Sequence, residues 1–204
     1  MLINIAVFIS GRGSNFLALL KNIENGALKD CRIAVVFSNN PNAKGLEYAA
    51  NAGIKTIIIP SKNRDDRKEY DKEIIDALAE YDIDLICLAG YMRIVTSELV
   101  EAYKNKIMNI HPALLPSFPG LHAQKQALDY GVKVSGCTVH FVDCGMDTGA
   151  VILQKTVPVY DNDTEDTLSA RILEQEHTAY TEAVALYAAG RLKVSGRKVG
   201  VLDK

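Results

Sequence analysis

Short apolar runs alternate, along the first half of the chain, with stretches in which apolar residues recur every three or four positions. The apolar runs predict strands at 2–9, 32–38, 54–60, 84–90 and 106–112. The periodic stretches predict helices at 15–26, 44–53, 65–81 and 95–103. Strands that are apolar throughout, without polar alternation, are typical of a parallel sheet covered by helices on both faces.

The pattern changes in the second half of the chain. Two apolar runs at 134–143 and 150–160 are separated by a short connection, which predicts an antiparallel pair at the end of the sheet. A periodic stretch at 164–189 predicts a long helix, with Asp163 as its N-cap and Gly190 at its end. We therefore expect an α/β fold: a Rossmann-like open, mostly parallel sheet with helices on both faces, antiparallel strands at one end and a long C-terminal helix.

No repeat or linker interrupts this pattern, so we expect a single domain over residues 1–204. The 23 Lys and Arg residues against 25 Asp and Glu residues give a formal net charge of −2, which argues against a nucleic-acid-binding surface. No window approaches the ~20 apolar residues of a membrane span, and the N-terminus lacks the features of a signal peptide. The four cysteines form no CxxC motif, which favours buried thiols in a reducing cytoplasm over a metal site.

The segment ISGRGSNF, residues 9–16, joins the first predicted strand to the first predicted helix. Open parallel sheets bind ligands at the carboxyl ends of their strands, where helix N-termini offer backbone N–H groups to an anion. The two glycines allow a close backbone approach, and Ser14 and Asn15 add donors, so we expect a phosphate monoester; a plain capped turn is the alternative. A dinucleotide is disfavoured, because Phe16 replaces the third glycine of GxGxxG and VFSNN lacks the expected acid.

Asn109 and His111 lie at the end of the apolar run 106–112. Residues two apart on a strand point to the same face, so an amide and an imidazole would project together. This pair suits a reaction that passes through an oxyanion, with the imidazole moving a proton. A nearby carboxylate would favour the charged imidazolium. Asp147, in the loop CGMDTGA, is one candidate, although most loop aspartates only cap turns.

Other chemistries lack the residues that they require. The chain has no GxSxG elbow and no HExxH motif, so neither a serine hydrolase nor a zinc protease is expected. His122, His140 and His177 show no ligand spacing, and we expect them to be structural. No metal site is therefore predicted.

Eight segments carry a resemblance that covers nearly the whole chain: GRGSN (11–15), FSNN (37–40), DRKEYD (66–71), LAGYMRIV (88–95), NIHPALLPSFPG (109–120), VHFVD (139–143), MDTGAVILQ (146–154) and EQEH (174–177). NIHPALLP with the later Asp-x-Gly resembles the folate-dependent formyltransferase superfamily, and GRGSN resembles its phosphoribosylglycinamide formyltransferase branch. The resemblance implies transfer of the formyl group of 10-formyltetrahydrofolate, a co-substrate, to the amine of 5′-phosphoribosylglycinamide in purine biosynthesis. It implies small-molecule partners, no metal, no nicotinamide, and a cytoplasmic monomer or homodimer.

The resemblance also assigns roles to individual residues. The family's catalytic trio matches Asn109, His111 and Asp147. Positions that contact the phosphate and ribonucleotide match Gly13, Ser14, Asn15, Gly90 and Glu176. Positions that contact the folate match Arg67, Met92, Arg93, Ile94, Val95, Asn109, Cys144 and Met146. Leu173, Cys144 and Gly145 depart from the residues that relatives carry there.

Three rival functions remain at this point. Formyltetrahydrofolate hydrolase uses similar residues but passes the formyl group to water, and its relatives usually carry an extra N-terminal domain. Methionyl-tRNA formyltransferase carries an extra C-terminal domain and a basic surface. A non-catalytic module that binds a sugar phosphate would not need the catalytic trio. Because the chain runs from Met1 directly into a predicted strand, ends at Lys204 and is slightly acidic, we expect the phosphoribosylglycinamide branch.

Overall fold

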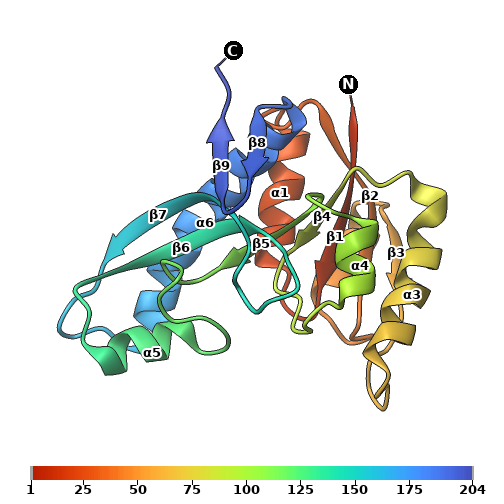
Figure 1. Cartoon of the computed structure of the whole chain (residues 1–204). Helices are drawn as coiled ribbons and strands as arrows, with labels where there is room; N and C mark the ends of the chain where they lie inside the picture. Colours follow the sequence, from red (N-terminus) through yellow and green to blue (C-terminus); the bar gives the residue numbers. More distant parts are fainter. Residues whose placement is uncertain (1, 204) are drawn as a thin grey trace. The chain divides into compact units, whose positions relative to one another are not determined.

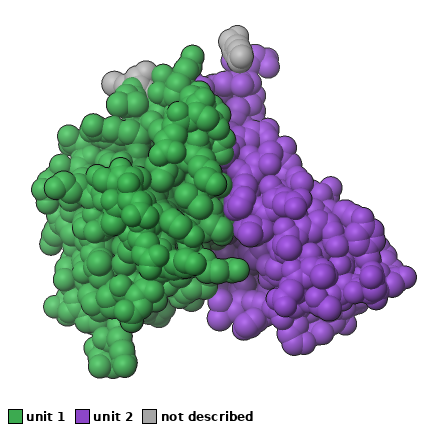
Figure 2. Space-filling model, turned by 180° about the vertical axis from the view of Figure 1, so that it is seen from behind, with its two compact units in different colours: residues 1–109 green, residues 110–204 purple. Residues whose placement is uncertain are grey.

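The computed structural model describes residues 2–203. The chain divides into two compact units, Met1–Asn109 and Ile110–Lys204, which are coloured separately in Figure 2. The expectation of a single domain over 1–204 stays a prediction.

The first unit is built on parallel strands. They are β1 (Ile3–Ile9), β2 (Cys31–Ser38), β3 (Lys55–Ile58), β4 (Leu85–Leu88) and the start of β5 (Ile107–His111). Their order is β3-β2-β1-β4-β5, and each neighbouring pair is parallel. The chain therefore reverses its direction of travel across the sheet between β1 and β4, the kind of position at which open α/β sheets bind ligands.

Two pairs of helices accompany these strands. They are α1 (Ser14–Glu24) with α2 (Gly45–Asn51), and α3 (Arg67–Leu78) with α4 (Ser97–Ala102). Because parallel crossovers are right-handed, this strand order puts the two pairs on opposite faces of the sheet, and Figure 1 shows α1 apart from α3 and α4. The predicted cover of helices on both faces is confirmed for this unit.

The continuous apolar runs are explained by burial on both faces. All four residues of β4 are buried, as are the last five residues of β1. Tyr70 and Ile74 of helix α3 also belong to the core of this unit, at 1% and 0% exposed. A period-2 alternation would put polar groups into this core, so it is absent from the sequence.

The second unit carries antiparallel strands and the longest helix. Its elements are α5 (Ala123–Tyr130), β6 (Val134–Phe141), β7 (Val151–Pro158), α6 (Glu165–Ala188), β8 (Leu192–Ser195) and β9 (Lys198–Val201). β6 and β7 form the predicted antiparallel pair, and α6 packs along both (Figure 1). The prediction of antiparallel strands at one end of the sheet is confirmed. The β6–β7 pair was expected to be the last of them, but the order is β6-β7-β9-β8, because an antiparallel β8–β9 hairpin adds beside β7 at Val151 and Lys198. Helix α5 and this hairpin were not predicted.

The start of α6 corrects one prediction. The N-cap is Thr164, whose hydroxyl accepts a hydrogen bond from the backbone N–H of Thr167 in a capping box. Asp163 is instead held by Arg171, whose guanidinium donates to both carboxylate oxygens at 2.8 Å. The predicted end is confirmed, because Gly190 follows the helix in the left-handed conformation, with φ of 65°. Among the described helices, none is long and apolar enough to cross a membrane.

Candidate active site

The glycine loop lies between β1 and α1 in the first unit. Gly13 is the N-cap of α1 with φ of 73°, and the first turn of the helix has no acidic residue. A Cβ at Gly13 would lie 2.8 Å from the Cα of Gly45, so this position requires glycine for both its conformation and its space. Ser14 and Asn15 begin the helix, where backbone N–H groups have no partner within the helix. The arrangement suits an anion such as phosphate.

Polar residues after β2 form hydrogen bonds with this loop, a role that the sequence did not reveal. The hydroxyl of Ser10 donates to Asn39 Oδ1 at 2.6 Å and accepts from the backbone N–H of Met92 at 2.8 Å. Asn40 Nδ2 donates to the backbone oxygen of Ser10 at 3.0 Å. Gly90, with φ of 79°, accepts from the backbone N–H of Ser10 at 3.2 Å. The loops after β1, β2 and β4 are therefore joined by hydrogen bonds.

The segment 90–96 after β4 is fixed at three points. Its start is held by Ser10, and its end by Asp71, whose carboxylate accepts from Thr96 N and Oγ1 at 2.6 and 2.8 Å. Burial raises the pKa of Asp71, and the hydrogen bonds from Thr96 oppose that rise. In the middle, the guanidinium of Arg93 lies 4.5 Å from the ring centroid of Tyr70.

The predicted folate-contacting side chains of this unit differ in accessibility. Met92 and Ile94 are 65% and 51% exposed, so both are available to a ligand. Val95 is 6% exposed and offers little surface to a ligand. Arg67 is exposed at the first position of α3. Four of the predicted contacts therefore lie on one loop, and Arg67 lies on a separate element.

β5 carries the first two residues of the predicted trio. Asn109 pairs with Leu88 of β4 and is half-buried, whereas His111 at the end of the strand is 4% exposed. Because they are two residues apart on one strand, the pleat directs both side chains to the same face.

In the second unit, both ring nitrogens of His111 face oxygen atoms. Nδ1 lies 3.4 Å from Asp147 Oδ2, and Nε2 lies 2.8 Å from the backbone oxygen of Phe118. A carbonyl oxygen only accepts, so Nε2 carries a proton. An imidazolium satisfies both contacts at once, because it donates from both nitrogens. The structure thus brings His111 close to Asp147, the candidate carboxylate.

Asp147 has two further neighbours in this unit. Its Oδ2 accepts from the backbone N–H of Gly120 at 2.8 Å, and its Oδ1 lies 3.7 Å from Nε2 of His140. The Nδ1 of His140 donates to the backbone oxygen of Phe141 at 2.8 Å, and burial lowers the pKa of His140. His140 was expected to be only structural; the structure places it against the candidate catalytic carboxylate.

The loop that carries Asp147 is organised by Asp143. Its Oδ1 accepts from Gly145 N at 3.0 Å and from Thr148 Oγ1 at 2.6 Å. Cys144 and Met146 are exposed on this loop, as a ligand contact requires.

Glu176 lies on α6 and is 8% exposed. The pKa of Cys137 on β6 is raised to about 12, first by burial and then by the negative charge of Glu176. Leu173, one turn before it, is half-buried. Within residues 2–203, no group of three or more His, Cys, Asp or Glu side chains could hold a metal ion.

Comparison with known proteins gives a family match over most of the chain. The family described as formyl transferase matches residues 3–184. The phosphoribosylglycinamide formyltransferase of Escherichia coli (strain K12) is 44% identical over 191 residues, which are 94% of this chain and 90% of that protein. The crystal structure of glycinamide ribonucleotide transformylase 1 from Symbiobacterium toebii is 48% identical with a TM-score of 0.96, and the match covers 99% of this chain and 95% of that one. This match confirms the predicted fold class.

Two other matches are more restricted, one in the share of the relative that is covered and one in sequence identity. The trifunctional purine biosynthetic protein adenosine-3 of Drosophila melanogaster is 45% identical over 94% of this chain, and the chain spans only 14% of that protein. A formyltetrahydrofolate deformylase from Pseudomonas syringae has a TM-score of 0.92 at 26% identity, with 100% of this chain and 67% of that one covered. The deformylase shares the fold but is more distant in sequence.

Proposed function

We propose that this chain, which belongs to the formyl transferase family, transfers the formyl group of 10-formyltetrahydrofolate to the amine of 5′-phosphoribosylglycinamide. The products are the formylated ribonucleotide and tetrahydrofolate, in purine biosynthesis. The chain is an enzyme, a phosphoribosylglycinamide formyltransferase by its likeness to bacterial proteins of that name. The observation that carries the proposal is the buried His111, whose Nδ1 lies 3.4 Å from the carboxylate of Asp147.

The reaction needs one bond to form and one to break. The substrate amine attacks the formyl carbon, and the carbonyl oxygen becomes an oxyanion. The bond from that carbon to N10 of the folate then breaks, and the proton lost by the amine moves to N10. Asn109 donates from its amide to the oxyanion, and His111 stabilises it and passes the proton. Asp147 orients the imidazole and favours its charged form.

The ribonucleotide phosphate binds at the N-terminus of α1. Gly13, Ser14 and Asn15 supply N–H groups there, and Gly90 on the adjoining loop completes this part of the proposed site. Glu176, which is buried under β6, is proposed to contact the ribonucleotide. The hydrogen bonds among the loops after β1, β2 and β4 support a site formed in advance of substrate.

The folate, a co-substrate, is proposed to contact Arg67 and the segment Met92–Val95. The fixed backbone of that segment and the exposure of Met92 and Ile94 support this. Asn109, Cys144 and Met146 complete the proposed folate contacts. The reaction as proposed uses no metal and no nicotinamide, takes place in the cytoplasm, and requires no partner other than its two substrates.

The test separates transfer from hydrolysis. Purified protein is mixed with 10-formyl folate, with and without 5′-phosphoribosylglycinamide, while formation of the deformylated folate is followed by absorbance. Turnover that requires the ribonucleotide supports the proposal, and formate release without it would make the chain a hydrolase instead. His111→Ala should lower kcat by about 10²–10³, and Lys133→Ala, on an exposed position of the same unit, should leave it unchanged.

A further inference from the structure

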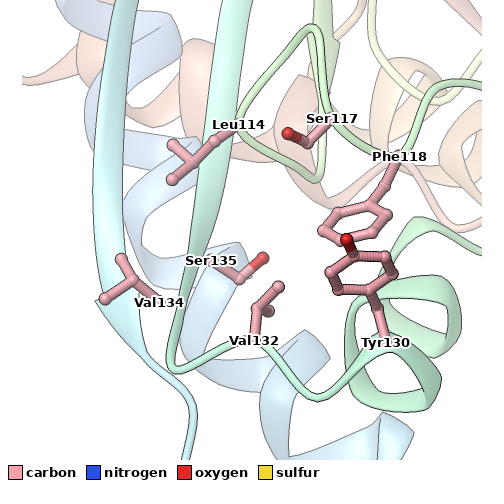
Figure 3. A pocket seen from close by; sticks show the side chains of 7 residues that line it. All are labelled: Leu114, Ser117, Phe118, Tyr130, Val132, Val134 and Ser135. Carbon is pink, nitrogen blue, oxygen red and sulfur yellow. The ribbon is translucent and has the colours of Figure 1, made fainter.

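A cavity of about 340 Å³ lies in the second unit, behind the loop that follows β5 (Figure 3). Its wall is formed by Leu114, Ser117, Phe118, Tyr130, Val132 and Val134, and Ser135 lies at its base. The volume is at the lower end of the ~300–1,000 Å³ range of small-molecule sites. None of the residues assigned to formyl transfer lines this cavity, so it is separate from the proposed active site.

Ser135 is the feature that points to a ligand. Its residue is 2% exposed, and its Oγ has no hydrogen-bond partner among residues 2–203. In Figure 3 the Oγ is directed toward the middle of the ring of lining side chains. The buried hydroxyl of Thr138, on the same strand, is paired: it donates to Ala113 O at 2.7 Å and accepts from Leu115 N at 3.0 Å. Buried hydroxyls are nearly always paired, so Ser135 lacks one polar partner that an occupant could supply.

The other lining residues define the chemistry of that occupant. No charged side chain lines the cavity, so an ion would lose its hydration without compensation. Phe118 and Tyr130 meet edge to face with their ring centroids 5.8 Å apart. Tyr130 is 81% exposed, so its side chain lies at the solvent-facing side of the cavity. The site fits one flat, neutral aromatic molecule with a single hydrogen-bonding group.

Phe118 connects this cavity to the catalytic histidine. Its ring forms part of the wall, while its backbone oxygen accepts the hydrogen bond from His111 Nε2 at 2.8 Å. Its φ of 56° lies in the left-handed region, which is uncommon for a bulky residue. With Nε2 held by Phe118, the proton that it carries points at the Phe118 carbonyl and not at a substrate in this conformation. Phe118 must therefore move before His111 can act.

We propose that this cavity is a second binding site, for a neutral aromatic molecule with one hydrogen-bonding group, and that its occupant inhibits formyl transfer by holding Phe118 against His111. The proposal that the cavity binds a ligand depends only on residues of the second unit. The inhibition half rests on the proposed function.

Indole is the probe for the first experiment, which uses the full chain and no substrate. Calorimetry should give saturable binding with one site. Ser135→Val should weaken it by about fivefold because it removes the hydroxyl, and Val132→Phe should abolish it by filling the cavity. The matched control Ser195→Val, on β8 and outside the cavity, should bind as the natural chain does. Circular dichroism confirms that each variant is folded, and absence of saturable binding, or binding that survives Val132→Phe, overturns the site.

The second experiment reads the histidine directly. Imidazole resonances of His111, assigned from a His111→Asn spectrum, should shift on addition of indole to the natural chain and stay unchanged in Val132→Phe. Indole should lower kcat of formyl transfer by at least about threefold in the natural chain only, by the energetic scale of one hydrogen bond. Binding with unshifted His111 resonances overturns the coupling. If binding and the shift occur but no formyl transfer is found, the site stands and the proposed function fails.

Discussion

Replacing Asp147 by asparagine removes one charge and little else. The carboxylate lies 3.4 Å from His111 Nδ1, and the two side chains are 13% and 5% exposed. At an effective dielectric constant of about 20, a pair of unit charges at that separation attracts by about 5 kcal/mol. An asparagine retains an oxygen for the Gly120 N–H, and its dipole replaces part of the attraction. We expect a loss of ~2.7–4 kcal/mol in the transition state, or about 10²–10³ in kcat.

The assay is steady-state formyl transfer at saturating concentrations of both substrates. Asp143→Asn is the matched control, because Asp143 lies on the same loop but binds Gly145 N and Thr148 Oγ1. That variant should loosen the loop, raising KM for the folate while kcat stays within about threefold. A folded Asp147→Asn enzyme with kcat within threefold of normal would refute the reasoning. Equal losses of kcat in both variants would assign the effect to loop order, and the charge argument would fail.

Three further predictions concern single side chains. Gly13→Ala should raise KM for the ribonucleotide at least ~10-fold and destabilise the chain by about 1–3 kcal/mol, because the new Cβ would lie 2.8 Å from the backbone of α2 in a left-handed conformation. Gly11→Ala is its control, since a Cβ there meets nothing within 4 Å. Asp71→Ala should cost about 1–3 kcal/mol in urea unfolding and raise KM for the folate, because Thr96 loses its acceptor; an unchanged KM would show that Asp71 does not position the loop. Burial lowers the pKa of His140 in the folded chain, so the unfolded chain binds a proton there more readily, and stability falls as pH drops below the ordinary histidine pKa. His140→Gln should lose less stability than the natural chain between about pH 7.5 and about pH 5.5, and an equal loss in urea titrations would contradict this.

The sequence was sufficient where burial alone decides the structure. Every strand of the first unit was predicted. β1 and β4 were predicted because strands covered on both faces must be apolar, whereas the largely exposed β3 was predicted from its apolar run alone. Helix α5 and the β8–β9 hairpin were missed because they are short: α5 buries only Ala123 and Ala127, and each strand of the hairpin has four residues, none of them buried. The prediction of Asp163 as the N-cap was wrong. Residue type alone cannot show that the carboxylate of Asp163 accepts hydrogen bonds from Arg171 and does not cap the helix.

In the candidate site, too, some features could be predicted from the sequence and others could not. Asn109 and His111 could be paired from the sequence because strand spacing is regular. The short distance between Asp147 and His140 could not be predicted, since it depends on how the loop after β6 folds back on that strand. The sequence did not predict the role of Ser10, Asn39 and Asn40, because their hydrogen bonds join loops that are far apart in the sequence.

The segment after β4 separates the tasks of support and recognition. Ser10 and Asp71 hold its backbone and Tyr70 contacts the guanidinium of Arg93, whereas the side chains of Met92 and Ile94 are exposed and take no part in these contacts. A randomised library at these two positions would therefore vary the rim that meets a ligand without redesigning its scaffold. Directed evolution toward altered folate analogues has a natural starting point there, with a search space small enough to screen completely.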